Sequence, residues 1–412
     1  MVIMKLMNLL SPNLLCINKI RSFESVVTQY KNKLIKEETI KQSTIDNITK
    51  RFNAWCEDEF DHSTDYKPSL ENIKNPTFKG LRSMTHKWEG MDFSTFGKEP
   101  KQTGYDLKTL IKIAHESINV DENVHTVHER LKRTHIEARK KLLKDNKADW
   151  ATAEAMAIGS LMQEGYNVRL VGEDTDRGTF SNRHLKMVDQ ETNHKFFPLR
   201  ESDYMSQTTN GRLEVFNSNL SEYGPMSYEY GYSLENPKNL CMWEAQFGDF
   251  YNPAQMLIDQ YLLGNEEKWL RQTGLVVMLP HGNDGAGPEH SSGHIERFLQ
   301  KVNTSIFDEN GYGNEDLTYQ QANMHIANMT MPSNYFHILR RHMHRNYRKP
   351  LILFTPKQGL RHPLARSSLS DFDEGTKFQP IITEKYVKKG EKAKKIFFCS
   401  GAVWLKLHQV SY

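Results

Sequence analysis

WATAEAMAIGSLMQEGYNVRLV, residues 150–171, holds the most informative transition in this sequence. Alanine, methionine, isoleucine and leucine recur at helical spacing from Trp150 to Glu164, and Gly165 is a typical residue at which a helix ends. An apolar strand, Val168–Val171, follows at once. A helix that leads directly into a short buried strand is the repeating unit of parallel sheets, so this segment predicts an α/β fold.

The same alternation continues toward the C-terminus. We predict further helices at 223–233, 253–263 and 334–345, and further strands at 240–244, 275–279, 326–329 and 350–355. Together these elements indicate a mostly parallel, doubly wound sheet with helices on both faces. We place this domain at residues 146–356.

The segments that flank this domain differ from it in composition. Residues 25–145 are charged and mostly helical in pattern, which indicates a helical connector. Residues 357–412 begin as a polar linker and end in an apolar stretch, Lys395–Leu405. We predict that this stretch is a strand, the first of an incomplete C-terminal domain.

Residues 1–24 have a composition of their own. Lys5, Lys19 and Arg21 stand among apolar residues and asparagine, and no acid precedes Glu24. This acid-poor, amphipathic profile is typical of a mitochondrial transit peptide, and an arbitrary leader is the alternative that the sequence leaves open.

Charge and cysteine content exclude several classes of protein. The chain of 412 residues has 54 basic and 51 acidic residues, and a net charge of +3 is too small to indicate a nucleic-acid partner. Basic residues gather at 130–144 and 340–349, where we expect solvated helical faces.

The cysteines Cys16, Cys56, Cys241 and Cys399 form no CxxC pair, which argues against a disulfide framework or a structural zinc site and favours a reducing compartment. No apolar run is long enough to span a bilayer.

Functional side chains are concentrated in four loop-like segments, which lie beside predicted strands and helices. They are residues 172–184, 217–224, 243–250 and 279–292. Open α/β sheets bind their ligands at such positions, so we expect the site there.

The last of these segments suggests two kinds of site from its residues alone. His281, His290 and His294 could be zinc ligands, but no HExxH-type motif supports that interpretation. Gly282, Gly285 and Gly287 could cradle a phosphate, but the Lys-Ser/Thr ending of a P-loop is missing. A flexible turn is the simpler interpretation of these glycines.

Three long motifs carry a family resemblance. WEAQFGDF at 243–250, KWLRQTG at 268–274 and PHGNDGAGPEHSS at 280–292 resemble the decarboxylating dehydrogenase component of the 2-oxoglutarate dehydrogenase complex. The similarity extends from about residue 28 to the C-terminus and is strongest over 149–356. The resemblance implies a mitochondrial matrix enzyme of the tricarboxylic acid cycle that decarboxylates 2-oxoglutarate oxidatively and passes the succinyl group to the lipoyl arm of dihydrolipoyl succinyltransferase.

In that family thiamin diphosphate lies between a pyrimidine-binding and a diphosphate-binding domain, and this chain resembles the former. Glu222 matches the acid that bonds the aminopyrimidine ring, and Leu220 and Phe250 would provide an apolar setting for it. Without the resemblance, Glu222 would be interpreted as a charge in the first turn of a helix.

The resemblance also assigns the residues around the pyrimidine. Phe250 matches the aromatic residue that stacks on the ring, with Gln246 and Phe247 close by. His290 matches a histidine that faces the substrate, where it would bind the 2-oxo acid or assist acyl transfer. Taken alone, such a phenylalanine is more often part of a core, and such a histidine is more often incidental.

The chain departs from the family pattern at two places, and it lacks the motif that holds Mg2+ and the diphosphate. Asn182-Arg183-His184 stands where relatives usually have His-Arg-His, and Gly293-His294 stands where Ala-Arg is common. A Gly-Asp-Gly motif with a downstream asparagine, which holds Mg2+ and the diphosphate in thiamin enzymes, is missing. We therefore expect a second polypeptide to supply that half, in a homodimer or a heterotetramer. A catalytically incomplete fragment, an interaction subunit and a 2-oxoadipate dehydrogenase homologue are the alternatives.

Overall fold

The computed structural model describes residues 22–64, 87–92, 100–269, 271–303, 322–383 and 395–410. The chain forms two compact units, Met1–Leu70 and Glu71–Tyr412. In the first unit, the helices α3 (Val26–Lys36) and α4 (Gln42–Thr64) are described, and the Ser25 hydroxyl caps α3 by accepting from the Thr28 amide. The transit-peptide interpretation of residues 1–24 falls almost entirely outside the described residues. None of the helices in the described residues has the length and apolar character that a membrane crossing requires.

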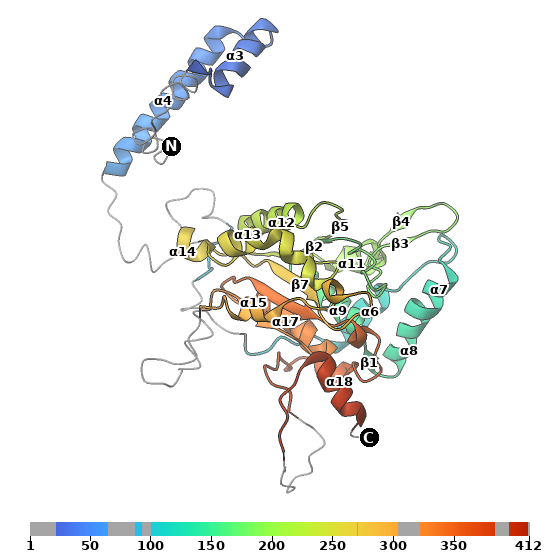
Figure 1. The fold of residues 1–412 in the computed structure, drawn as a ribbon. Coiled ribbons are helices and arrows are strands. Elements are labelled where there is room, and N and C mark those ends of the chain that lie inside the picture. The colour runs from blue at the N-terminus through green and yellow to red at the C-terminus, as the bar shows by residue number, and fades with distance from the viewer. Residues whose placement is uncertain are drawn as a thin grey trace. The chain divides into compact units, whose positions relative to one another are not determined.

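The second unit is built on a six-stranded sheet in which every neighbouring pair of strands is parallel (Figure 1). In spatial order the strands are β5 (Leu213–Asn217), β2 (Asn167–Gly172), β6 (Asn239–Glu244), β7 (Val276–Pro280), β9 (Leu351–Thr355) and β8 (His325–Ala327). The α/β prediction and the predicted strands of this sheet are confirmed. Only β5, an edge strand, was not predicted from the sequence.

Side chains that alternate along the central strands build two separate cores. On β6, Met242 belongs to one cluster of buried residues, whereas Cys241 and Trp243 belong to the other. Since successive side chains of a strand point to opposite faces, each face of the sheet has its own core. The sheet is therefore covered on both sides, as the sequence predicted.

The helix α9 (Trp150–Gln163) is buried along almost its whole length in the first core. The Asp149 carboxylate caps it by accepting from the Thr152 amide at 2.9 Å, and the chain leaves it through Gly165 with a φ of +86°. α9 packs against α6 (Leu107–Glu116) and α17 (Pro332–His344). A Cβ at Gly159 would lie 2.4 Å from the side chain of Ile113 on α6, so glycine allows these two helices to approach closely.

The second core lies beneath α12 (Tyr223–Glu235) and a continuous helical stretch. That stretch consists of the 3-10 turn η3 (Gly248–Ala254), α13 (Gln255–Leu257) and the π-helical η4 (Ile258–Leu262). We predicted one helix at 253–263; the structure confirms helical backbone there but divides it. Pro253 lies inside the 3-10 turn, where it has no amide to donate to a regular α-helix.

Smaller elements complete the second unit. They are α7 (Glu129–Leu131), η2 (Lys132–Glu137), α8 (Ala138–Lys144), β1 (Lys147–Ala148), β3 (Met187–Val188), β4 (Lys195–Phe196), α10 (Pro198–Glu201), α11 (Asp203–Thr208), α14 (Asn265–Trp269), η5 (Pro288–His290), α15 (Ile295–Leu299), η6 (Gln358–Leu360), β10 (Ser367–Ser368), η7 (Leu369–Phe372) and α18 (Gly401–Val410). β1 pairs with β10 and β3 with β4, both antiparallel.

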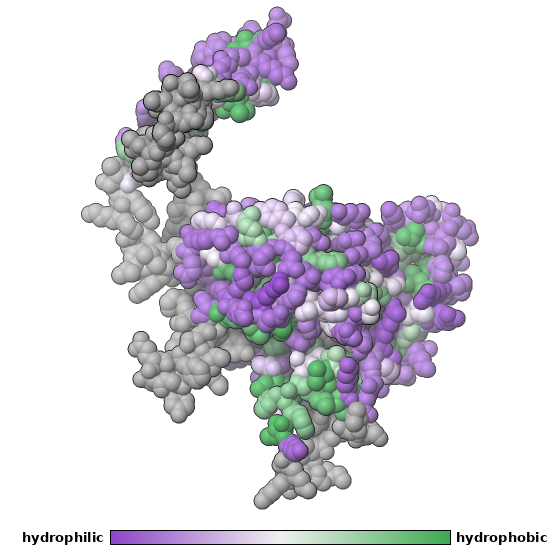
Figure 2. All heavy atoms as spheres, in the orientation of Figure 1, coloured by the Kyte–Doolittle hydropathy of each residue, from purple (hydrophilic) through white to green (hydrophobic). Residues whose placement is uncertain are grey.

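The prediction of a strand at Lys395–Leu405 is wrong. Residues 395–400 have no regular structure, and α18 begins at Gly401, whose amide donates to the Thr330 hydroxyl. An apolar run forms a strand only where another strand offers it a partner, and the side chains at 396–398 are instead exposed. Figure 2 shows the resulting hydrophobic surface around α18.

The interpretation of residues 340–349 as a solvated face is also wrong. Arg340, on α17, is 1% exposed and donates to the carbonyl of Thr103, the Ser160 hydroxyl and the Glu164 carboxylate. Arg348 is also buried, and its guanidinium donates to several backbone carbonyls. The count of charges does not reveal which side of α17 faces the core. Within 130–144 the lysines and arginines are exposed or half-buried, as expected, with the exception of the buried Arg139.

Replacement of Arg340 tests this correction. Arg340→Ala removes three hydrogen-bonded contacts and leaves Glu164 without its arginine partner, so we expect a loss of about 3–5 kcal/mol in the free energy of unfolding. Denaturant titration followed by circular dichroism measures it. Arg133, exposed in the other basic cluster, is the control, and Arg133→Ala should change stability by less than about 0.5 kcal/mol. Equal effects of the two substitutions would show that Arg340 is not buried as described.

Candidate functional site

Parallel register brings the four loop segments to one edge of the sheet. Gly172, the last residue of β2, is aligned with Asn217 at the end of β5 and with Glu244 at the end of β6. Pro280, the last residue of β7, is aligned with Thr355 at the end of β9. The segments that follow these strands therefore all leave the sheet at its carboxyl edge, which is where open α/β sheets bind ligands.

Three of the residues predicted for the site form one aromatic cluster. The ring centroids of Phe247 and His290 are 4.3 Å apart, and that of Phe250 lies 5.7 Å from Phe247 and 5.6 Å from His290. Phe180, from the loop after β2, packs edge-on against Phe247 at 5.8 Å. The structure thus joins residues from the loops after β2, β6 and β7. All four of these side chains are partly exposed, and their rings can take part in binding.

A glycine permits this cluster to form. Gly248 lies between Phe247 and Phe250, and a Cβ at this position would be 2.5 Å from the Pro280 carbonyl oxygen and 2.7 Å from Cα of Gly293. Both obstacles are backbone, so any larger residue would push the loop after β6 away from the loop after β7. Close approach of these backbones is what puts Phe247 beside His290.

The imidazole of His290 is held mainly by packing. Its side chain is 27% exposed, its Nε2 lies 3.7 Å from the Glu289 carboxylate, and its Nδ1 is buried without a hydrogen-bond partner among the described residues. Lys357, which follows β9, donates from Nζ to the backbone carbonyl of His290. The same ammonium lies 4.9 Å from the centroid of Phe247. A partly exposed imidazole without a close hydrogen-bond partner among the described residues is able to bind a ligand or transfer a proton.

Glu222 and Leu220 lie at the start of α12, beyond the end of β5. Glu222 is half-buried, and in the part of the chain that the structure describes its carboxylate takes part in no hydrogen bond or ion pair. Leu220 is 74% exposed. In the same described part, no hydrogen bond or ion pair connects either residue to the aromatic cluster. The two residues are therefore on the predicted edge of the sheet, and their roles remain predictions. Gln246 is half-buried and adjoins Phe247 in the chain.

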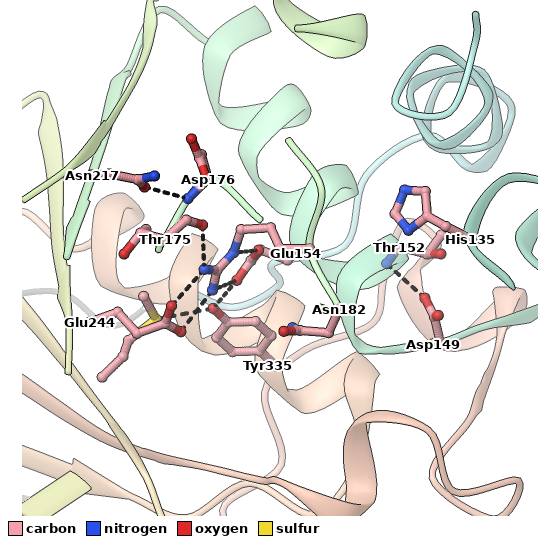
Figure 3. A network of polar contacts seen from close by, with 12 residues as sticks. His135, Asp149, Thr152, Glu154, Thr175, Asp176, Asn182, Asn217, Glu244 and Tyr335 are labelled. Carbon is pink, nitrogen blue, oxygen red and sulfur yellow. Dashed lines mark hydrogen bonds and ion pairs between the residues drawn. The ribbon is translucent and has the colours of Figure 1, made fainter. Parts of the chain in front are cut away.

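Arg183 lies at the centre of a buried ionic network, and Figure 3 shows the side chains of Glu154, Glu244 and Tyr335 pointing toward one another in it. Its guanidinium donates to Glu154 on α9 at 2.5 and 3.1 Å and to Glu244, the last residue of β6, at 2.6 and 2.8 Å. Burial opposes the charge of Arg183, but the two carboxylates outweigh it and raise the arginine pKa well above its ordinary range. Tyr335 on α17 donates to Glu154 at 2.6 Å, and burial together with that carboxylate raises the tyrosine pKa. The network fixes the loop after β2 to the end of β6.

The loop after β2 is backbone-strained as well as anchored. Asp174, Ser181 and His184 have positive φ angles of 52°, 54° and 49°, which side chains other than glycine seldom adopt. Burial and the neighbouring Arg139 lower the pKa of His184 to about 4, so this histidine is neutral at pH 7. The sequence pattern indicated that this loop carries functional side chains, but it did not indicate that Arg183 is buried between Glu154 and Glu244.

No group of three or more His, Cys, Asp or Glu side chains that could hold a metal ion occurs in the described residues. A hollow of about 830 Å³ lies along β8 and residues 397–404, and none of the predicted site residues lines it. A small cavity of about 30 Å³ adjoins Phe180, Arg183 and Pro356. The predicted site residues therefore lie beyond the carboxyl edge of the sheet and not in the large hollow.

Family models match two consecutive parts of the chain. The one described as transketolase, pyrimidine binding domain, matches residues 146–363, and the one described as 2-oxoglutarate dehydrogenase C-terminal matches residues 366–411. The first covers more than half of the chain. The chain belongs to the thiamin diphosphate-dependent 2-oxoglutarate dehydrogenase-type E1 family.

Individual relatives of this E1-type chain agree with that membership. It is 42% identical to a probable 2-oxoadipate dehydrogenase complex component E1 homolog of Dictyostelium discoideum, over 95% of this chain and 42% of the relative. It is 42% identical to the mitochondrial 2-oxoglutarate dehydrogenase of Saccharomyces cerevisiae, over 95% of this chain and 38% of the relative. It is 41% identical to the human 2-oxoadipate dehydrogenase complex component E1, over 93% of this chain and 39% of the relative. The chain thus spans about two fifths of the length of these relatives.

The structure also shows what surrounds the two departures from the E1 pattern. At Asn182 it is the backbone carbonyl that accepts from Arg139, at 2.6 Å, so this contact does not depend on the side chain at position 182. His294 has a φ of +52° and pairs through Nε2 with Asp249, in the loop that carries the aromatic cluster. It also pairs through Nδ1 with Glu296 at 3.2 Å. His294 therefore links α15 to that loop.

The network around Arg183 gives a prediction for stability. Arg183→Met leaves the carboxylates of Glu154 and Glu244 buried without their common cation, and we expect the free energy of unfolding to fall by about 3–5 kcal/mol. Arg177, exposed in the same loop and paired with Asp174, is the matched control. Arg177→Met should cost less than about 1 kcal/mol in the same urea titrations. A small loss for Arg183→Met would contradict the central position that we assign to this network.

Proposed function

We propose that this chain supplies the pyrimidine side of a thiamin diphosphate site in an oxoglutarate dehydrogenase (succinyl-transferring). The observation that carries the proposal is the cluster of Phe247, Phe250 and His290 at the carboxyl edge of the sheet. This cofactor needs an aromatic face, an imidazole and a carboxylate from its pyrimidine-binding domain. Glu222, beyond β5, offers a carboxylate that has no partner among the described residues.

Each of these residues has a distinct role. Phe250 stacks on the pyrimidine, with Gln246 and Phe247 beside it, and Leu220 belongs to the apolar wall. Glu222, in the apolar setting that this wall provides, hydrogen-bonds a ring nitrogen. The exposed side chain of Leu220 indicates that another polypeptide surface completes that setting. When bound, thiamin diphosphate supplies the carbanion equivalent that attacks the keto carbon and accepts electrons as carbon dioxide leaves.

His290 acts on the substrate side. Its imidazole can donate a hydrogen bond to the 2-oxo acid or move a proton during transfer of the succinyl group to a lipoyl arm. The His290 side chain is 27% exposed, which leaves part of the imidazole accessible for such a bond. Lipoyl transfer implies dihydrolipoyl succinyltransferase as a partner, and the reaction is one of the tricarboxylic acid cycle.

In this proposal the diphosphate-binding half of the same enzyme holds the diphosphate and its Mg2+, within a homodimer or a heterotetramer. Relatives that include a mitochondrial enzyme favour the mitochondrial matrix as the location. We propose no nucleic-acid partner.

A second candidate substrate is 2-oxoadipate. The Dictyostelium and human relatives are 2-oxoadipate dehydrogenase components, and they are as similar to this chain as the yeast 2-oxoglutarate dehydrogenase is. The two acids differ by one methylene, which a pocket distinguishes by about 1–3 kcal/mol.

Turnover of an assembled enzyme tests the function. The purified chain is mixed with a diphosphate-domain polypeptide, thiamin diphosphate and Mg2+, and release of carbon dioxide is measured with each acid. We expect release that depends on both polypeptides, with kcat/KM about tenfold or more higher for 2-oxoglutarate. The opposite preference would assign 2-oxoadipate as substrate. No release with either acid would identify a catalytically incomplete fragment or an interaction subunit.

Glu222→Gln tests the carboxylate. Glutamine keeps the shape of the side chain but cannot share a proton with the pyrimidine, so the assembled enzyme should lose about 100-fold or more in kcat. Glu235, exposed at the other end of α12, is the matched control, and Glu235→Gln should leave kcat unchanged. A near-normal rate in Glu222→Gln would remove this residue from the mechanism.

A further inference from the structure

Lys357 is the cation of the aromatic cluster, and the roles given above to the site residues do not use it. It follows the end of β9 and is half-buried. Its Nζ donates to the carbonyl of His290, lies 4.9 Å from the centroid of Phe247 and lies 5.9 Å from that of Phe180. In the described residues this ammonium has no carboxylate in ion-pair contact. Its contacts are therefore a peptide oxygen and two aromatic faces.

Lys357 contacts the peptide of His290, which the packing of the imidazole does not fix by itself. Hydrogen bonds do not set the direction of the imidazole, because Nδ1 has no partner among the described residues and Nε2 has only the distant Glu289 carboxylate. The ring direction therefore depends on the rings of Phe247 and Phe250 and on the peptide that carries it. Lys357 binds that peptide and one of those rings at the same time.

We propose that Lys357 is a positioning residue for His290. The ammonium holds the His290 peptide next to Phe247, and so keeps the imidazole in its place beside Phe247 and Phe250. This inference rests on the proposed function for its catalytic consequence, but the arrangement itself is a property of this chain. A charged donor to a carbonyl and a cation over an aromatic face are both stronger where water is partly excluded than in bulk water.

The electrostatic surroundings agree with a charged lysine that is not neutralised by an ion pair. Burial lowers the pKa of Lys357, and Asp284 partly opposes that effect. Burial first and Lys357 second lower the pKa of His281, whose Nδ1 accepts from the Gly293 amide. Glu296 and His294 also act on His281, in opposite directions. The pKa of His281 therefore reports the charge of Lys357 within the chain.

The segment that contains Lys357 is itself well anchored. Arg361, four residues further on, donates to the carbonyl of Phe180 at 2.6 Å. Leu405 of α18 packs beside Gly359, and Gln409 bonds His362 at 2.6 Å. Residues 357–362 therefore connect the loops after β2 and β7, and α18 supports them from behind. A rigid support is what a positioning residue requires.

Two substitutions separate charge from packing. Lys357→Met keeps the aliphatic chain and removes the ammonium, whereas Lys357→Arg keeps a cationic donor. Lys112, exposed on α6 with its ammonium 3.7 Å from the centroid of Tyr204, is the matched control for loss of a cation–aromatic contact away from the site. Thermal unfolding of each purified chain first verifies that it is folded.

The first measurement uses the chain alone, by NMR titration of the histidine side chains. In Lys357→Met we expect the pKa of His281 to rise and the imidazole signals of His290 to shift, since a positive neighbour has gone and the peptide is released. Lys357→Arg and Lys112→Met should resemble the wild type. Unchanged His281 and His290 signals in Lys357→Met would overturn the proposal.

The second measurement uses the assembled enzyme. Misplacement of His290 should lower kcat about tenfold or more in Lys357→Met, while KM changes less than about threefold, and Lys357→Arg should recover most of the rate. A loss that falls on KM would mean that Lys357 binds substrate directly, and an equal defect in Lys357→Arg would mean that charge is irrelevant; either result overturns the positioning role. An inactive wild-type assembly would count against the proposed function, and the NMR result would still decide the inference.

Discussion

The bridge that Arg183 forms between Glu154 and Glu244 is the interaction on which the site depends. It joins a helix, a loop and the end of a central strand at one buried point, and a charge in that position is stable only while both carboxylates remain in contact with it. Glu244 is followed at once by the segment that contains Phe247 and Phe250. The ion pair of Glu244 with Arg183 consequently fixes the direction in which that segment leaves the sheet. Tyr335 extends the same constraint to α17.

The sheet and the loops make different contributions to this site. Two cores, one on each face, hold the strands in a parallel register, so that all six carboxyl ends of the strands lie at the same edge. The loops then bring side chains together over short distances, and they do so by backbone contacts. Gly248 allows the loops after β6 and β7 to touch, and His294 joins α15 to the first of these loops. Strand ends are rigid and loops are adaptable. The side chains of the aromatic cluster can therefore have well-defined positions, although none of them lies within a strand.

Sequence patterns predicted most of the sheet because its central strands are apolar on both faces and are separated by helices with clear starts and ends. β5 was missed because it is an edge strand with a mixed sequence, and 395–405 was misassigned because an apolar run does not reveal whether a partner strand exists.

The motifs selected Phe247, Phe250 and His290, which the structure brings together. Arg183 could not be recognised in the same way, since its partners lie 29 and 61 residues away in the chain. The environment of Glu222 also depends on surfaces beyond its own segment, and its role stays a prediction.

The same physical reasoning explains why the open edge of this sheet suits a ligand. Folded proteins pair nearly all of their buried polar groups, because an unpaired one costs about 1–3 kcal/mol. Yet Nδ1 of His290 is buried and unpaired, and the carboxylate of the half-buried Glu222 has no bond, as far as the described residues show. Both groups lie beyond strand ends of one edge, and the apolar side chain nearest in sequence to Glu222, Leu220, is exposed. In the proposed assembly, a ligand with a hydrogen-bonding ring, enclosed by a second polypeptide surface, would pair the Glu222 carboxylate and cover Leu220. The carboxylate without a partner and the exposed apolar side chain are therefore the features that such an assembly would use for binding.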